Sequence, residues 1–154
     1  MKSEETDEYY WKKDDFEKLK SANLMPEFFA IAMNILNHMP DPVSLVCGPI
    51  STGGKGSIPK NLEVFKEYIV NLQKGGRTVF NQLPFEEKFG ELASRSTLKY
   101  FTPILDDFFL PLFKSGKIKE MCFMPGWESS TGARWENDMS DKLGIKKTLL
   151  LPLQ

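Results

Sequence analysis

VSLVCGPISTGGKGS, residues 43–57, joins a short apolar run to a loop rich in glycine and hydroxyl side chains. The run VSLVC is continuous rather than alternating, which is typical of a strand that is buried on both faces of a parallel sheet. The loop does not fit the Walker phosphate-binding motif, because the seventh residue counted from Gly48 is Gly54 and not lysine. The stretch therefore predicts a first strand, followed at its carboxyl end by a flexible loop that offers backbone N–H groups.

Three further short apolar runs follow, and amphipathic stretches separate them. Residues 61–76 carry Leu62, Phe65, Ile69 and Leu72 at helical spacing, and a glycine pair ends this predicted helix. The predicted strands are 43–48, 77–82, 119–124 and 146–153. The other predicted helices lie between Asp7 and His38, over residues 98–116 and over residues 131–144. The helix over 98–116 is expected to be interrupted near Pro103 and Pro111. The polar residues 84–96 predict a mobile loop with helical pieces.

Strands that alternate with helices predict a parallel sheet with helices on both faces. We therefore expect one α/β domain, residues 41–154, with a flavodoxin- or Rossmann-like three-layer architecture, and a helical N-terminal extension, residues 1–40. Ligands of such sheets bind outside the carboxyl ends of the strands. The segments expected at that edge are GPISTGGKGS, NQLPFEE and PGWESSTGARWE, which are rich in glycine, polar and acidic residues.

The composition argues against several classes of function. Lysine and arginine total 20 and the acidic residues 21, so a net charge of −1 provides no general attraction to nucleic acid or to an anionic membrane. No stretch approaches the roughly 18 apolar residues that span a bilayer. The N-terminus lacks the apolar core of a signal peptide. The single histidine, His38, has no cluster of potential ligands, so we expect no metal site.

The cysteine content indicates a reducing compartment. Cys47 and Cys122 both lie inside apolar runs, where we expect buried, reduced thiols. Small secreted domains use more cysteines than this for their disulfides. The sequence therefore predicts a cytoplasmic protein, and nothing in it requires an organic cofactor.

The segment SSTGARWE, residues 129–136, combines hydroxyl groups, a glycine and an acid at the start of a predicted helix. Unpaired N–H groups at a helix N-terminus, together with hydroxyls, suit a phosphate or a carboxylate. Glu136 follows Ser130 by six residues, so its side chain reaches the same region. The structural alternative is that Ser130 or Thr131 caps the helix and that Glu136 is a solvated or salt-bridged helix residue.

Three stretches in this order resemble the nucleoside 2-deoxyribosyltransferase superfamily: VCGPISTGGKGS (46–57), GGRTVFNQ (75–82) and PGWESSTGARWENDMSDKLGI (125–145). Within it the chain is most similar to the deoxynucleoside 5′-monophosphate N-glycosidases and to a bacterial and phage branch of the same fold. The resemblance extends over roughly residues 43–153. Pro49 departs from the family pattern, which has a serine at this position.

The resemblance implies roles for individual residues. Glu136 matches the family's catalytic glutamate, which attacks C1′ of the sugar, and Ser130 matches the serine that binds the 5′-phosphate. Gly132 falls in register with the same motif. The loop that surrounds base and sugar is matched by residues of the first stretch, where Ser51 is a further candidate: Gly48, Ile50, Gly53 and Gly54.

The family also uses an aspartate to protonate the leaving base, and here Asp106 and Asp107 are both candidates. Glycosidic cleavage passes through an oxocarbenium-like state, so one carboxylate faces the anomeric carbon while an acid protonates the departing group. The environments of the two carboxyl groups must therefore differ. The alternative for Asp106 and Asp107 is a pair of solvated helix residues, or one residue that caps a helix.

Two other side chains are candidates for contact with the base. Trp127 stacks on a base or covers the edge of the sheet, and the sequence favours neither interpretation. Asn81 ends the second predicted strand at the expected ligand-binding edge, where its amide could read the base.

These observations predict an enzyme that cleaves the N-glycosidic bond of a nucleoside or deoxynucleoside 5′-monophosphate, and releases free base and sugar 5-phosphate. The alternatives are base exchange by a 2-deoxyribosyltransferase and a nucleotide-binding or sensing module without turnover. The expected partners are a small nucleotide or nucleoside and further copies of this chain in a homodimer or larger homo-oligomer, which the family resemblance implies. We expect binding neither to nucleic acid nor to a membrane.

Overall fold

The computed structural model describes residues 10–94 and 104–153. The chain divides into two compact units, which are treated separately here. The helical unit comprises Met1–Met39 and Asn81–Lys117, and the sheet unit comprises Pro40–Phe80 and Ile118–Gln154. The predicted division into residues 1–40 and 41–154 stays a prediction. The structure also groups residues 81–117 with the N-terminal helices, which the sequence did not indicate.

The sheet unit contains a four-stranded sheet in the order β2-β1-β3-β4, and all of its pairings are parallel. The strands are β1 (Val43–Cys47), β2 (Thr78–Val79), β3 (Ile118–Phe123) and β4 (Lys146–Leu149). All five residues of β1 are buried, as its continuous apolar pattern predicts. The predicted α/β class and the parallel sheet are confirmed.

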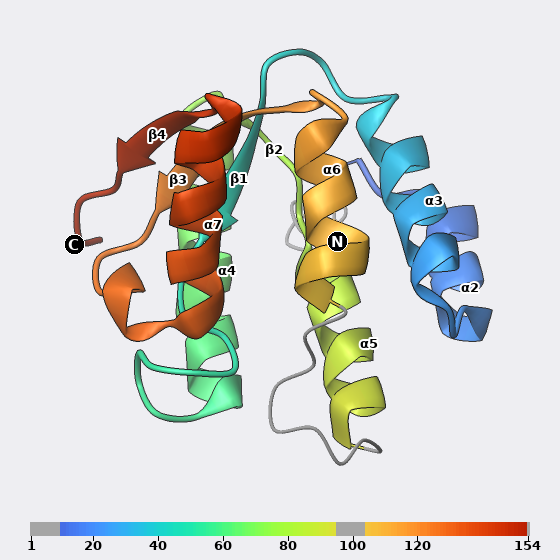
Figure 1. Cartoon of the computed structure of the whole chain (residues 1–154), viewed down its shortest axis with the longest axis horizontal. Coiled ribbons are helices and arrows are strands. Elements are labelled where there is room, and N and C mark those ends of the chain that lie inside the picture. Colours follow the sequence, from blue (N-terminus) through green and yellow to red (C-terminus); the bar gives the residue numbers. More distant parts are fainter. Residues whose placement is uncertain (1–9, 95–103, 154) are drawn as a thin grey trace. The chain divides into compact units, whose positions relative to one another are not determined.

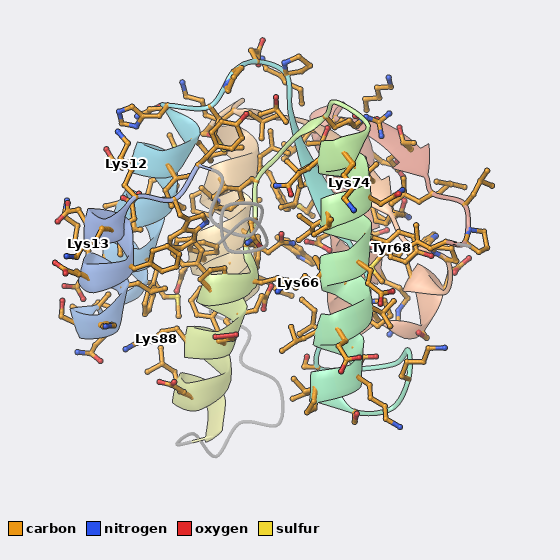
Figure 2. All side chains as sticks on the ribbon, turned by 180° about the vertical axis from the view of Figure 1, so that it is seen from behind. Lys12, Lys13, Lys66, Tyr68, Lys74 and Lys88 are labelled. Carbon is orange, nitrogen blue, oxygen red and sulfur yellow. The ribbon has the colours of Figure 1, made fainter. Side chains whose placement is uncertain are left out.

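Helices α4 (Ile58–Lys74) and α7 (Thr131–Leu143) cover opposite faces of this sheet, as the two views in Figures 1 and 2 show. Both helices begin at a serine N-cap: the Oγ of Ser57 accepts from the Lys60 amide and the Oγ of Ser130 from the Ala133 amide. Gly144 ends α7 with a φ of 70°, which is the left-handed conformation that favours glycine. The predicted three-layer arrangement is confirmed.

The register of the sheet determines which side chains share a face. Cys47 is paired with Phe123 and Val46 with Cys122, so Cys47 and Cys122 lie on opposite faces of adjacent strands. Both thiols are free and buried, as the sequence predicted. The alternation of side chains in a strand thus accounts for two neighbouring cysteines that do not form a disulfide.

The helical unit contains α2 (Lys13–Ser21), α3 (Met25–Leu36), α5 (Leu83–Ser94), the π-helix η1 (Ile104–Phe109) and α6 (Leu110–Lys114). Its core is aromatic: the ring centroids of Phe85 and Phe89 lie 4.9 and 5.0 Å from that of Phe108. Phe28 meets Phe89 edge to face at 5.2 Å. Each of these four side chains is at most 1% exposed.

Helix α5 corrects the prediction of a mobile loop at residues 84–96. The structure has a regular α-helix over Leu83–Ser94, while residues 95 and 96 lie outside the described ranges. Phe85 and Phe89 are four residues apart, so they lie on one face of the helix and are buried together. The charged residues between them and Gly90 obscured this apolar face in the sequence.

Strands β2 and β4 are shorter than predicted. β2 stops at Val79, because the Oδ1 of Asn81 accepts from the Leu83 amide and starts α5. Beyond β4, the Leu153 amide donates to the Oη of Tyr68 on α4 at 3.3 Å instead of extending the sheet. None of the helices in the described ranges is long and apolar enough to cross a bilayer.

Candidate functional site

The loop between β1 and α4 and the turn before α7 are joined by hydrogen bonds at the carboxyl end of the sheet. We call residues 48–57 the glycine loop and residues 125–131 the α7 turn; the turn includes the 3-10 helix η2 (Trp127–Ser129). The Gly54 amide donates to the Oγ of Ser129 at 2.9 Å, and the Thr131 amide donates to the Oγ1 of Thr52 at 2.9 Å. The structure thus brings together two of the three segments that were predicted to meet at this edge.

Gly53 and Gly48 of this assembly lack room for a side chain. Gly53 has a φ of 70°, and a Cβ atom there would collide with the backbone and the Oγ of Ser129. A Cβ atom on Gly48 would collide with the Sδ of Met124, which follows β3. Both glycines were predicted as site residues, and both permit a close approach between the ends of β1 and β3.

Asn61 organises the glycine loop from inside the sheet unit, a role that the sequence analysis did not assign. Its Nδ2 donates to the carbonyl oxygens of Ile50 at 2.9 Å and Gly53 at 3.2 Å, and its Oδ1 accepts from the Lys55 amide at 2.8 Å. The residue is 3% exposed. A polar residue on the buried face of an amphipathic helix, four positions after its N-cap, is the signal that could have identified it.

Ser130 is primarily the N-cap of α7. Its Oγ accepts from the Ala133 amide at 3.2 Å, and the residue is 3% exposed. The capping alternative considered for the sequence is therefore present in the structure. The Gly132 amide has no hydrogen-bond acceptor among the described residues. The first turn of α7 thus offers one uncommitted N–H group and the proton of the Ser130 hydroxyl.

Glu136 projects from the second turn of α7 to the end of β1. The residue is 8% exposed, and its carboxylate lies near the Cys47 thiol. Burial and the neighbouring Glu136 raise the pKa of the Cys47 thiol well above its usual range, so the thiol keeps its proton. The alternative of a solvated glutamate at this position does not hold. A buried carboxylate therefore lies beside a protonated thiol at the carboxyl end of β1.

The remaining predicted side chains of the sheet unit surround the α7 turn. The Trp127 ring is half-buried, with its centroid 5.2 Å from that of Phe123 at the end of β3. Ser51 is exposed and Ile50 is half-buried. Arg134 donates to the carbonyl oxygen of Glu128 at 2.6 Å, which ties the turn to the outer face of α7.

The other predicted residues belong to the helical unit. Asn81 is 9% exposed and caps the start of α5, and its carbonyl oxygen accepts from the Nε1 of Trp11 at 2.9 Å. Asp106 and Asp107 lie on η1 and are both exposed. The choice between these two aspartates stays a prediction.

Glu86 is a titratable group of the helical unit that the sequence analysis missed. It lies in the first turn of α5, and burial raises the pKa of its carboxyl to about 7. A carboxylic acid with this pKa is partly protonated at neutral pH, which suits proton transfer. The only signal for Glu86 in the sequence is its position next to Phe85, an apolar residue of the predicted loop.

A second buried carboxylate, Glu120, lies on the face of the sheet opposite to Cys47. Its Oε1 accepts from the Oγ of Ser44 at 2.9 Å, and its Oε2 accepts from the Oγ1 of Thr148. Burial opposes its ionisation. The two hydroxyl donors, together with Arg77 at 3.4 Å, nevertheless lower the pKa of Glu120 below its ordinary value. Each carboxylate oxygen has a hydroxyl donor, so this network joins β1, β3 and β4 to one another and to Arg77, the residue before β2.

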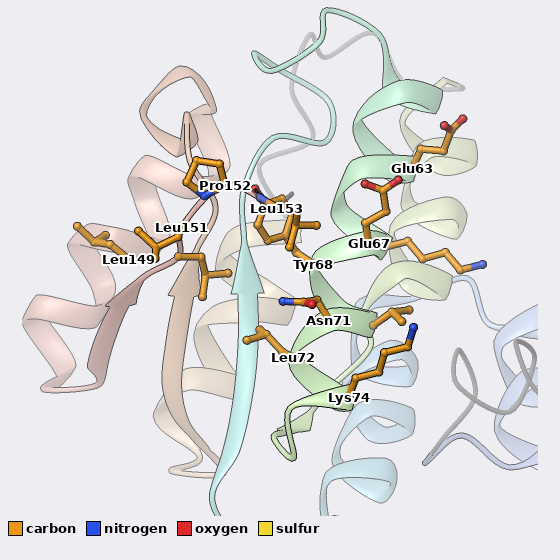
Figure 3. A pocket seen from close by; sticks show the side chains of 13 residues that line it. Glu63, Glu67, Tyr68, Asn71, Leu72, Lys74, Leu149, Leu151, Pro152 and Leu153 are labelled. Atoms are coloured by element: carbon orange, nitrogen blue, oxygen red, sulfur yellow. Dashed lines mark hydrogen bonds between the residues drawn. The ribbon is translucent and has the colours of Figure 1, made fainter.

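A groove of about 1000 Å³ lies elsewhere in the sheet unit, between α4 and the segment after β4 (Figure 3). Tyr68 and Leu72 of α4 form one wall, and Leu151 to Leu153 form the other. Glu63 and Glu67 lie along the helix at one end and Lys74 at the other (Figure 3). Its described lining includes none of the predicted site residues, so it is separate from the Glu136 region.

Among the residues that the structure describes, no group of three or more histidine, cysteine or acidic side chains is arranged to hold a metal ion. The sequence matches no family model, and comparisons with curated proteins and with solved structures find no significant relative. The assignment of function therefore depends on the geometry of the site and on the sequence motifs.

Proposed function

We propose that this chain cleaves the N-glycosidic bond of a nucleoside or deoxynucleoside 5′-monophosphate, with Glu136 as the nucleophile. The observation that carries the proposal is the placement of a buried Glu136 beside the end of β1, next to the joined glycine loop and α7 turn. The order of the sequence motifs that contain these residues supports the same activity. A buried carboxylate at the carboxyl end of a parallel sheet is suitably placed for a bound sugar.

In this reaction a carboxylate oxygen of Glu136 attacks C1′, and the bond between C1′ and the base nitrogen breaks. The electron pair of that bond passes to the base, which takes a proton from an acid. Water then attacks C1′ and gives one proton to the conjugate base of that acid, and cleavage of the ester bond restores the Glu136 carboxylate. The predicted proton donor, Asp106 or Asp107, belongs to the helical unit and stays a prediction. The chemistry needs no metal and no organic cofactor.

The 5′-phosphate is assigned to the first turn of α7. The Gly132 amide and the hydroxyl proton of Ser130 are donors at a helix N-terminus, where the helix dipole favours an anion. Ser130 has two functions in this proposal, because its Oγ also caps the helix that carries Glu136. The glycine loop surrounds the base and sugar, and Trp127 is the proposed contact to the base. Asn81 belongs to the helical unit, and its contact to the base stays a prediction. We place the protein in the cytoplasm as a homodimer or larger homo-oligomer.

Product analysis by chromatography tests the proposal. The protein is incubated with each common ribo- and deoxyribonucleoside 5′-monophosphate, with and without an added free base. Glu136→Gln is the test variant, and Asp138→Asn, an exposed acid of the same helix, is the matched control. We expect free base and sugar 5-phosphate from the wild type and from Asp138→Asn, and a rate at least about 1000-fold lower from Glu136→Gln.

The other outcomes separate the alternatives. A nucleotide with an exchanged base identifies a transferase that uses the same nucleophile. Binding of a nucleotide without turnover would indicate a nucleotide-binding module. Equal turnover by wild type and Glu136→Gln would overturn the role of Glu136.

A further inference from the structure

Strand β4 forms an open edge of the sheet. The order β2-β1-β3-β4 places it at one end of the described sheet, next to β3. The Leu150 amide donates to the Phe123 carbonyl oxygen at 2.8 Å, so this position turns its N–H group to β3. Backbone groups alternate in direction along a strand, and those of Lys147 and Leu149 therefore point away from the sheet. A row of outward N–H and C=O groups is a template for a further strand.

Two exposed leucines lie on this edge. Leu149 is 68% exposed and Leu151 82%, the largest exposed fractions of large apolar side chains among the described residues (Figure 3). The segment that bears them is held at two points: Leu150 is bonded to β3, and the Leu153 amide donates to the Oη of Tyr68. Apolar side chains fixed next to outward backbone groups indicate an interaction surface that a strand can cover.

Lysines on an edge strand usually oppose pairing with another strand, because their charges repel a second copy. In β4 both lysines have an acidic neighbour within the chain. The Nζ of Lys147 lies 2.9 Å from the Oδ1 of Asp141 on α7 and donates to the Oδ1 of Asn137 at 2.9 Å. Lys146 is in register with Glu120 of β3. The charges of the edge are therefore compensated within the chain, and a second copy can approach.

We propose that β4 pairs with β4 of a second copy of this chain, antiparallel and around a two-fold axis at Leu149. In this register Leu149 lies opposite Leu149 of the second copy, and Lys147 lies opposite Leu151. These are hydrogen-bonded pairs, in which the two residues exchange both N–H···O bonds. Pro152 has no N–H group to donate, but it follows Leu151 and lies outside this outward-facing row.

The edge is self-complementary in this register, which favours a second copy over an unrelated strand. Leu149 covers its own equivalent. The methylene groups of Lys147 lie against Leu151, since the ammonium group of that lysine is turned to Asp141. Such isologous pairing around a two-fold axis is the commonest association of identical chains. The inference rests on the homo-oligomer of the proposed function, for which it names the surface, and not on the proposed reaction.

The first test follows assembly of the full chain by sedimentation velocity over a range of concentrations. Leu149→Glu and Leu149→Lys each set two like charges opposite one another across the axis. We expect the dissociation constant of the dimer to rise at least about 10-fold in each. An equimolar mixture of the two variants sets opposite charges across the axis and should restore dimers. Leu24→Glu is the matched control, because Leu24 is 65% exposed and precedes α3 of the helical unit, and it should assemble like the wild type.

The possible results separate the surface from the assembly itself. A wild-type chain that stays monomeric would overturn the proposal together with the homo-oligomer, and would leave the edge to an extended segment of another protein. A wild-type dimer that neither substitution weakens would overturn the surface alone. Dimers that are weakened in both variants and not restored in the mixture would overturn the axis at Leu149. Turnover of nucleotides is not a readout here, so failure of the proposed reaction leaves this test intact.

The second test examines the register by disulfide cross-linking. Leu149→Cys sets two thiols on residues whose Cα atoms are about 5.5 Å apart in a hydrogen-bonded antiparallel pair, which suits a disulfide. Leu151→Cys is the control, because this position lies opposite Lys147 and not opposite itself. After oxidation we expect a covalent dimer from Leu149→Cys alone, since Cys47 and Cys122 are buried. Equal cross-linking of both variants in non-reducing electrophoresis would overturn the register.

Discussion

The amide of Gly54 donates to the Oγ of Ser129 at 2.9 Å, which joins the loop after β1 to the turn after β3. Parallel strands end at the same edge, so segments that are 75 residues apart in sequence meet there. The Oγ of Ser129 also donates to the Gly126 carbonyl oxygen at 2.8 Å, and its geometry is therefore determined within the turn. The loop and the turn form one continuous structure next to Glu136.

The approach of Gly53 to Ser129 predicts a specific intolerance to a side chain. Gly53→Ala introduces both a strained positive φ and a collision with Ser129, so we expect a loss of about 2–4 kcal/mol in the free energy of unfolding. Gly56→Ala is the control, because Gly56 has a φ of 85° and a Cβ atom there meets nothing within 4 Å. Denaturant unfolding measures both variants. Equal losses would mean that the contact with Ser129 contributes nothing.

The hydrogen bonds of Asn61 predict that its amide nitrogen stabilises the glycine loop. Asn61→Asp keeps the acceptor for the Lys55 amide but sets a carboxylate oxygen against the carbonyls of Ile50 and Gly53. We expect a loss of about 1–3 kcal/mol in the free energy of unfolding and faster amide exchange in residues 50–56. Asn71→Asp, on the exposed side of the same helix, should change neither. Loop exchange rates like those of the wild type in Asn61→Asp would refute this role.

The raised pKa of Glu86 predicts a stability that declines as the pH rises. The unfolded chain releases this proton near pH 4.5, whereas the folded chain retains it to about pH 7. Its contribution is fully present below pH 4.5 and is lost through pH 7, by up to about 3 kcal/mol. Glu86→Gln should therefore flatten the pH dependence of the free energy of unfolding between pH 4.5 and 8. Glu87→Gln, an exposed neighbour, should leave the slope as in the wild type.

The lowered pKa of Glu120 predicts a stability that declines as the pH falls, which is opposite to the pH dependence expected from Glu86. Its ionised form is stabilised by Ser44, Thr148 and Arg77, so its contribution is present above the ordinary pKa of 4.5 and declines as the pH falls through the lower folded value. We expect Glu120→Gln to cost about 1–3 kcal/mol at pH 7 and to reduce the acid sensitivity of unfolding. Glu63→Gln, exposed on α4, serves as the control. Full stability of Glu120→Gln at pH 7 would contradict this role of the network.

The parallel sheet could be predicted from VSLVC and KEMCF, because short, continuous apolar runs between amphipathic helices are typical of buried parallel strands. Gly48, Gly53 and Glu136 could be placed at the ligand-binding edge for the same reason. The role of Asn61 could not be predicted, since a single sequence does not show which backbone groups a buried amide will meet. Helix α5 was missed because Phe85 and Phe89 find their partner Phe108 only through the tertiary fold.

The pairing of Cys47 with Phe123 also makes the surroundings of Glu136 dependent on correct strand alignment. A slip of β1 by a single residue against β3 would turn Cys47 to the opposite face and present Val46 or Gly48 to Glu136 instead. The same slip would separate Ser44 from Glu120 on the far face. Misaligned molecules would thus lose the thiol beside Glu136 on one face and the polar network on the other face at once. The two faces of the sheet therefore depend on one and the same strand alignment.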